Sequence, residues 1–67
     1  MNRIHVNGEP MDIPQGWRIA DLLLDLGYQG RRVAVEQNGE IVPRSRHDGS
    51  PLNPDDRIEI VVAVGGG

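Results

Sequence analysis

The last three residues of this 67-residue chain, Gly65, Gly66 and Gly67, directly follow an apolar segment. Glycine loses the most backbone entropy on ordering and brings no side chain to a core, so such a tail cannot serve stability. It can extend by roughly 3.3–3.6 Å per residue, which would carry a carboxylate at Gly67 about 10 Å beyond the domain. Because it has no Cβ atoms, it would fit a narrow channel in another protein. We therefore expect the tail to carry the chemistry, with a frayed, inert end as the alternative.

The other groups that could do chemistry form no recognisable constellation. His5 and His47 are far apart in the sequence, and the chain has no cysteine. Without carboxylates at ligand spacing no zinc site is expected, and both histidines are predicted to lie on the surface. Asp55 and Asp56 are adjacent acids, but such a pair after a proline usually forms a turn and points apart. The sequence thus predicts no catalytic group and no metal site in the domain.

Length and charge exclude several classes of function. A chain of 67 residues makes one small domain, since about 60 residues bury only about 60% of their unfolded surface. Seven basic and ten acidic residues give a net charge of −3, without the basic surface of a nucleic-acid-binding module. The first residues alternate polar and apolar, unlike a signal peptide or a membrane span. Together with the lack of cysteine, this predicts a cytoplasmic protein with no nucleic-acid or membrane partner.

A hairpin and a helix are predicted in the first half of the chain. Apolar and polar residues alternate on both sides of Asn7-Gly8, a pair that accepts positive φ in a tight turn. After a break at residues 14–16, aliphatic residues recur at positions 19, 22, 23 and 26, which is the spacing of one helix face. Gly27 would end this helix, and Asp21 would lie near the positive end of its dipole. No Ser, Thr, Asp or Asn stands at the expected cap near Arg18.

The second half predicts another hairpin and a closing strand. Asn38-Gly39 separates β-branched runs at residues 33–35 and 41–42, and Pro43 would end their pairing. Residues 44–56 are expected to be loop anchored by Leu52, and residues 58–64 are the longest strand candidate. This order predicts the α+β class, with a mixed sheet of four to five strands packed on one helix. We expect a β-grasp domain over residues 1–64 and a flexible tail over residues 65–67.

The alternation of the last strand predicts a surface beside the tail. The expected core is aliphatic: Ile4, Val6, Ile13, Ile19, Leu22, Leu23, Leu26, Val35, Ile41, Leu52, Ile58, Ile60 and Val62. If residues 58, 60 and 62 face the helix, the period of two sends Glu59, Val61 and Ala63 to the opposite face. We expect these three residues to contact a partner, with ordinary sheet surface as the alternative.

The chain resembles the ThiS family of sulfur carriers, which are ubiquitin-like β-grasp proteins. The matching segments span nearly the whole chain: Ile19-Ala20-Asp21-Leu22-Leu23, Val33-Ala34-Val35-Glu36 with Asn38-Gly39, Ile41-Val42-Pro43-Arg44-Ser45, and Ile58-Glu59-Ile60-Val61-Val62 before the glycines. The terminal diglycine is shared by many β-grasp proteins, whereas the Val-Pro-Arg-Ser segment narrows the resemblance to ThiS. Two departures from the family pattern, Trp17-Arg18 and Asp55-Asp56, leave the tail untouched.

This resemblance implies a protein cosubstrate rather than an enzyme. The carboxylate of Gly67 would be adenylated by an ATP-dependent, E1-like adenylating enzyme (ThiF-like). Sulfur from a cysteine desulfurase relay would then give a thiocarboxylate. A thiazole synthase (ThiG-like) would take that sulfur for thiamin thiazole biosynthesis. The chain would need no cofactor of its own, because the nucleotide and any metal would belong to its partners.

Three alternatives stay open. The same chemistry serves other pathways, such as molybdopterin synthesis. A ubiquitin-like modifier is the second alternative, although a chain without lysine could not build side-chain-linked chains on itself. The third is a β-grasp interaction module with an inert tail. Deletion of Gly66 and Gly67 separates this last alternative from a carrier, because only a carrier would lose its function.

Overall fold

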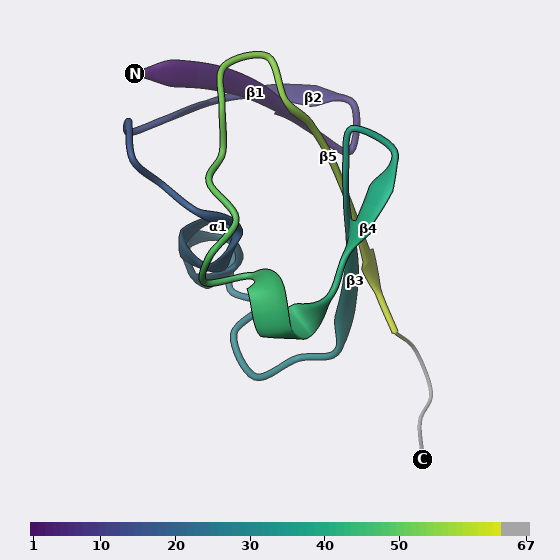
Figure 1. Ribbon diagram of the computed structural model, residues 1–67. Helices are drawn as coiled ribbons and strands as arrows, with labels where there is room; N and C mark the ends of the chain where they lie inside the picture. The colour runs from purple at the N-terminus through teal and green to yellow at the C-terminus, as the bar shows by residue number, and fades with distance from the viewer. Residues whose placement is uncertain (64–67) are drawn as a thin grey trace.

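The computed structural model describes residues 1–63, and these form a sheet, one α-helix and one short 3₁₀ helix (Figure 1). The elements are β1 (Asn2–Val6), β2 (Glu9–Ile13), α1 (Ile19–Asp25), β3 (Val33–Gln37), β4 (Glu40–Val42), η1 (Arg44–Arg46) and β5 (Arg57–Val62). Val64 and the three glycines of the expected tail lie outside the described residues.

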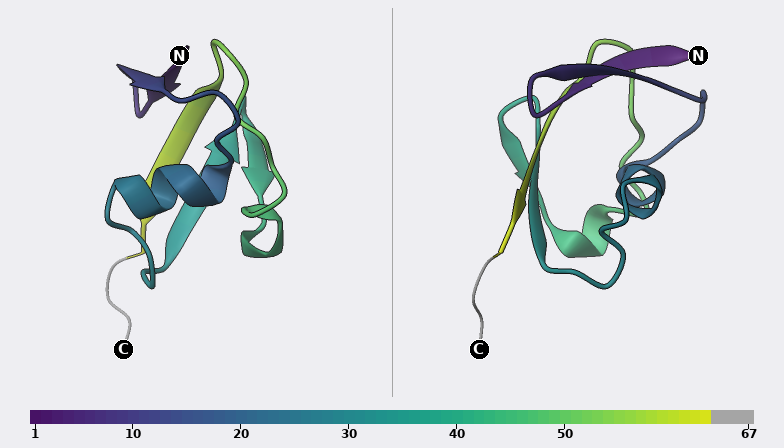
Figure 2. Two further views of the ribbon diagram at one scale, coloured as in Figure 1. Left: turned by 90° about the vertical axis from the view of Figure 1, so that its left-hand side faces the viewer. Right: turned by 180° about the vertical axis from the view of Figure 1, so that it is seen from behind.

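The five strands form one mixed sheet in the order β2-β1-β5-β3-β4. β5 pairs in parallel with β1, with Val6 opposite Ile58, and antiparallel with β3, with Val35 opposite Ile60. Figure 2 shows the twisted sheet curving around α1, which covers one of its faces. The predicted α+β class, with a mixed sheet on one helix, is confirmed. The last strand of the chain is the central strand of the sheet.

Both predicted hairpin turns are present, and their backbone angles explain their sequences. Asn7 and Gly8 have φ of 52° and 84°, and Asn38 and Gly39 have φ of 54° and 86°. Two consecutive residues with positive φ match the twist of paired strands, and Asn-Gly adopts this conformation with little strain. Asp55, in the turn before β5, also has a positive φ of 70°.

Helix α1 begins without a capping side chain at its first position, as the sequence indicated. The carboxylate of Asp21 accepts a hydrogen bond from the backbone N–H of Arg18 at 2.8 Å and so satisfies one free donor at this helix end. At the other end Gly27 has a φ of 83°, and the N–H of Tyr28 donates to the carbonyl of Leu23 at 2.8 Å. A helix of seven residues is too short to be stable alone, so it depends on packing against the sheet.

Two residues of the predicted core, Leu26 and Ile41, are exposed, Val6 and Val62 are only partly buried, and Val42 is buried although it was not predicted. Buried side chains are contributed by Ile4, Ile13, Ile19, Leu22, Leu23, Val35, Val42, Leu52, Ile58 and Ile60. Ile41 is 65% exposed, because Val42 lies opposite Val35 and the alternation of β4 turns Ile41 to the outer face. Leu26 is 37% exposed, because α1 ends at Asp25 and Leu26 is already its C-cap. The two predictions of burial were wrong for these reasons.

The predicted loop after β4 contains a buried histidine. His47 follows η1, and its Nε2 donates to the carbonyl of Val42 at 3.0 Å. Its own carbonyl accepts the N–H of Ala20 at 2.9 Å and so joins the loop to α1. His5 is partly buried in β1. The predicted surface position of His47 is wrong, because its imidazole is buried where it hydrogen-bonds to the end of β4 at Val42.

Asp56 is buried and joins the second hairpin to the segment before β5. Its carboxylate accepts hydrogen bonds from Gln37 Nε2 at 2.8 Å, Asn38 Nδ2 at 3.0 Å and the backbone N–H of Asn53 at 2.9 Å. Burial raises the pKa of Asp56, but the hydrogen bonds from Asn38, Asn53 and Gln37 together outweigh burial, so the pKa is lowered overall. Asp55 beside it is exposed, so the two acids differ in environment as a turn requires.

The lowered pKa of Asp56 predicts an acid-sensitive fold. Its stabilisation is complete above the ordinary Asp pKa of about 3.9 and is lost as the pH falls through the lowered folded-state value. We expect Asp56→Asn to cost about 1–3 kcal/mol at neutral pH, because its NH₂ group would face donors. Urea unfolding at several pH values measures both effects. The exposed neighbour provides the control: Asp55→Asn should change little, and an equal loss in both variants would contradict this role.

Candidate functional site

The segment that leads to the expected tail is held on its β3 side up to the last described residue. Val62 lies opposite Val33, and beyond the strand the N–H of Ala63 donates to the carbonyl of Arg32 at 2.9 Å. The direction in which the chain leaves the sheet is therefore set by backbone hydrogen bonds. The predicted roles of Gly65, Gly66 and Gly67 lie outside the described residues and stay predictions.

On its other side β5 pairs with β1 as far as Ile58, whose carbonyl accepts the N–H of Asn7 at 2.8 Å, and beyond that point the Asn7 side chain holds the strand. The Asn7 Oδ1 accepts the N–H of Ile60 at 2.7 Å, and its Nδ2 donates to the carbonyl of Ile60 at 3.2 Å. This amide continues the pairing where β1 has already turned away, because β1 and β5 pair directly only up to Val6 and Ile58. The sequence pattern indicates Asn7 only as a turn residue, because no local signal points to a contact 53 residues away.

The outer face of β5 carries the three residues predicted to contact a partner. Glu59, Val61 and Ala63 are exposed, and Val61 is 61% exposed, while Ile58 and Ile60 are buried. The expected alternation is confirmed, and the role of these residues as a contact surface stays a prediction.

Two further apolar residues extend this surface. Ala34 lies opposite Val61, and Ile41 shares the outer face through its partner Glu36. We call Ala34, Ile41, Val61 and Ala63 the outer-face patch. Ile41 was predicted to lie in the core and therefore not to belong to this surface.

The domain itself offers little chemistry. Within residues 1–63, no three His, Asp or Glu side chains lie close enough together to hold a metal ion. In the same part of the chain no helix is long and apolar enough to cross a membrane. Within the described residues the site thus consists of the end of β5, held by its neighbours, and the outer-face patch beside it.

Five strands grasping one helix, with the last strand in the centre, define a ubiquitin-like β-grasp protein. The chain belongs to the ThiS family, whose sequence model matches residues 4–67.

Solved and curated relatives agree with this family. The crystal structure of the thiamine biosynthesis protein ThiS from Geobacter metallireducens superimposes with a TM-score of 0.82 at 31% identity, covering 97% of this chain and 99% of that one. The chain is 42% identical over 65 residues to the thiazole synthase of Magnetococcus marinus, and spans one fifth (20%) of its length. It is also 33% identical to the uncharacterized protein ycf40 of Porphyra purpurea, over 96% of this chain and 90% of that protein.

The two hydrogen bonds of Asn7 predict a local weakness in β5. We expect Asn7→Gly to keep the turn but to lower stability by about 1–3 kcal/mol, because both backbone groups of Ile60 lose their partner. The Ile60 amide should then exchange its hydrogen faster, which NMR can follow. Asp55→Gly is the matched control, since it places glycine at another positive φ without removing such a bond. Unchanged protection of Ile60 in Asn7→Gly would contradict this role.

Proposed function

We propose that this chain is a sulfur carrier for thiamin thiazole biosynthesis and acts as a protein cosubstrate in the cytoplasm. The observation that carries the proposal is the ThiS family match, which runs through the domain to Gly67. The structural likeness to a thiamine biosynthesis protein and the sequence likeness to thiazole synthases support it. A thiazole synthase (ThiG-like) is accordingly proposed as the acceptor of the sulfur.

The chemistry would take place at the carboxylate of Gly67. An α-carboxylate with a pKa of about 3.3–3.7 is ionised at neutral pH and is a poor electrophile, so it must be activated. Its oxygen attacks the α-phosphorus of ATP in a ThiF-like enzyme, and pyrophosphate leaves. The outer sulfur of a protein persulfide, supplied by a cysteine desulfurase relay, then attacks the acyl carbon, AMP leaves, and an acyl disulfide forms. A second protein thiol attacks the relay protein's sulfur in this acyl disulfide, so that a protein disulfide forms and the carried sulfur leaves on the chain end. The product is a thiocarboxylate whose sulfur is a nucleophile at the end of a tether.

The domain suits this role as a rigid handle. Hydrogen bonds from Asn7 and to Arg32 fix the direction of β5 on both sides, so binding of the domain would also position the chain end. Glycine side chains offer no bulk that could block entry of Gly65 and Gly66 into an active-site channel. We propose that the outer-face patch, together with Glu59, forms the docking surface for the activating enzyme. Its apolar residues stay exposed in the free domain, as in many protein interaction sites.

Deletion of Gly66 and Gly67 tests the role of the tail. We expect the shortened chain to unfold at the same temperature as the full chain, but to support no ATP–pyrophosphate exchange by the ThiF-like enzyme, because the reacting carboxylate would no longer reach ATP. A shortened chain as active as the full chain would contradict the proposal. That result would favour an interaction module with an inert tail.

Replacement of Val61 tests the docking surface. Val61→Asp places a charge in the centre of the outer-face patch, and we expect it to raise the KM for the chain in the exchange reaction about tenfold, the effect of about 1.4 kcal/mol. The fold should persist, because Val61 is exposed. Gln15→Asp makes the same change of charge in the exposed loop before α1 and should leave KM unchanged. Equal KM values for the two variants would show that the outer-face patch is not part of the interface.

A further inference from the structure

Three arginines gather at the end of the sheet where β5 ends. Arg31 and Arg32 directly precede β3, and Arg44 follows β4. The carbonyl of Arg32 accepts the N–H of Ala63, so this cluster lies beside the last described residue of the chain. The three side chains also line one pocket of about 500 Å³ between α1 and η1. We call Arg31, Arg32 and Arg44 the arginine cluster.

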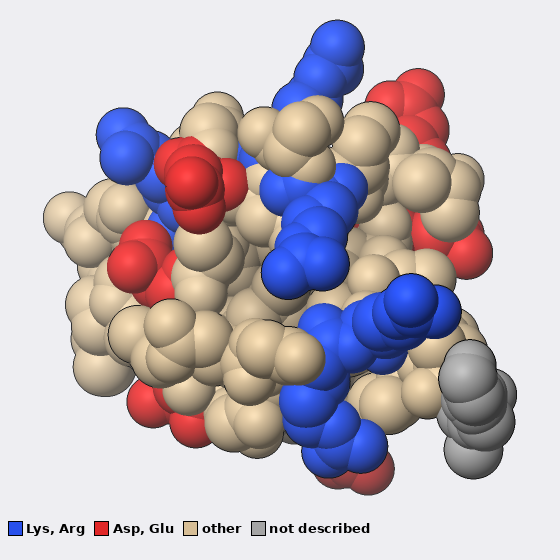
Figure 3. Space-filling model, turned by 90° about the horizontal axis from the view of Figure 1, so that it is seen from below, with Lys and Arg blue, Asp and Glu red and all other residues tan. Residues whose placement is uncertain are grey.

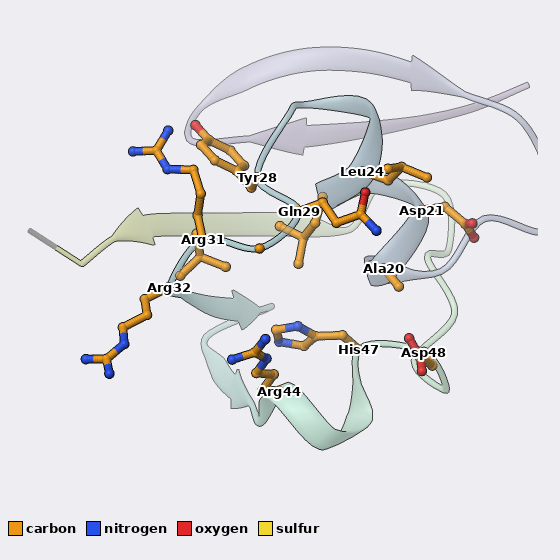
Figure 4. A pocket seen from close by; sticks show the side chains of 13 residues that line it. Ala20, Asp21, Leu24, Tyr28, Gln29, Arg31, Arg32, Arg44, His47 and Asp48 are labelled. Carbon is orange, nitrogen blue, oxygen red and sulfur yellow. The ribbon is translucent and has the colours of Figure 1, made fainter.

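The cluster has no carboxylate partners within the described part of the chain. There, the one side-chain ion pair joins Arg3 to Asp12 at 2.9 Å, on the β1–β2 hairpin. Asp21 and Asp48 also line the pocket, and Figure 4 shows them on the side away from Arg31 and Arg32, with Arg44 in between beside His47. The Arg31 and Arg32 side chains extend away from each other, and no ion pair within the described residues explains the three positive charges.

The position of the cluster is at odds with the overall charge of the chain. The net charge is −3, yet three of the seven arginines share one pocket. Seen from below, arginine side chains run from the centre of the face toward its lower right, with further arginines and acids at its top and left (Figure 3). The guanidinium of Arg31 lies 5.8 Å from the centre of the Tyr28 ring, a distance at which the ring attracts and helps to hold a cation. The arginine cluster is therefore a local positive surface on an acidic protein.

We propose that the arginine cluster is an electrostatic docking surface for Asp and Glu side chains on the enzyme that activates the chain end. This inference rests on the proposed function. Arginine presents a planar fork of N–H donors that matches a carboxylate, and unpaired arginines are free to make such bonds. A nucleic acid is a poorer fit, because the acidic remainder of the surface would repel a long polyanion.

Reach and position favour the activating enzyme as the partner. Gly67 is the fourth residue after Ala63, so the reacting carboxylate lies at most about 14 Å from Ala63. When an enzyme holds Gly67 in its active site, part of its surface must therefore lie close to the arginine cluster. The cluster lies on the helix side of the sheet, because Leu23 and Leu24 of α1 line the same pocket, whereas the outer-face patch lies on the opposite side. The enzyme would then contact the domain on both faces of the sheet, with β5 between the two contacts.

Exchange kinetics test this docking surface. The assay is ATP–pyrophosphate exchange by the purified ThiF-like enzyme, with the whole chain as the varied substrate. We expect Arg32→Gln/Arg44→Gln to raise KM about tenfold at low salt with kcat unchanged, because the cluster acts in binding and not at the reacting atoms. The difference should shrink at higher salt, as the screening length falls from about 30 Å at 0.01 M to about 8 Å at 0.15 M.

The control makes the same change of charge at two exposed arginines outside the cluster, Arg18 at the start of α1 and Arg57 at the start of β5. Arg57 is exposed at the start of this strand, about 16 Å from Val62, so Arg18→Gln/Arg57→Gln should leave KM within about twofold. Equal KM increases in the two double variants would overturn the proposal in favour of a general charge effect. Unchanged KM in the cluster variant would overturn it as well. If the wild-type chain supported no exchange at all, the proposed function itself would fail, which is a separate outcome.

Discussion

The central position of β5 is the constraint on which the rest of the structure depends. The last strand of the chain becomes the middle of the sheet only when β1 lies on one side and β3 on the other. Its two buried residues, Ile58 and Ile60, then face α1, and its exposed residues face outward. The fold therefore cannot close until β5 has been made. In return, β5 is held on both sides as far as Ile60, by β3 on one side and by β1 and Asn7 on the other.

Local chemistry predicted most of the elements from the sequence. Asn-Gly pairs specify tight turns, and aliphatic residues at helical or alternating spacing specify α1 and the strands, so both hairpins, the helix and β5 were found. The buried face of β4 was predicted wrongly, because a strand of three residues contains too little alternation to fix its register. Ile41 was expected to be buried, but Val42 is buried and Ile41 is exposed. The burial of His47 and Asp56 depends on partners that only the folded chain brings near. These contacts leave no pattern in the sequence.

The predicted contact residues also show that the sequence reveals local patterns but not contacts between distant segments. Glu59, Val61 and Ala63 follow from a period of two, which is a local property of one strand. Ile41 and Ala34 join them only through cross-strand pairing, and the arginine cluster only because the ends of β3, β4 and β5 meet. The amide of Asn7, which continues the pairing of β5, likewise depends on the parallel packing of β1 beside the last strand.

In this account the domain binds and directs, and the backbone end of the chain reacts. The most direct test of that claim is the intact mass of the protein after incubation with the ThiF-like enzyme, ATP and a sulfur source, followed by fragmentation. The account predicts a mass gain that corresponds to replacement of one oxygen by sulfur, located at Gly67. An unmodified chain, with the same enzyme preparation active on an established carrier, would contradict it.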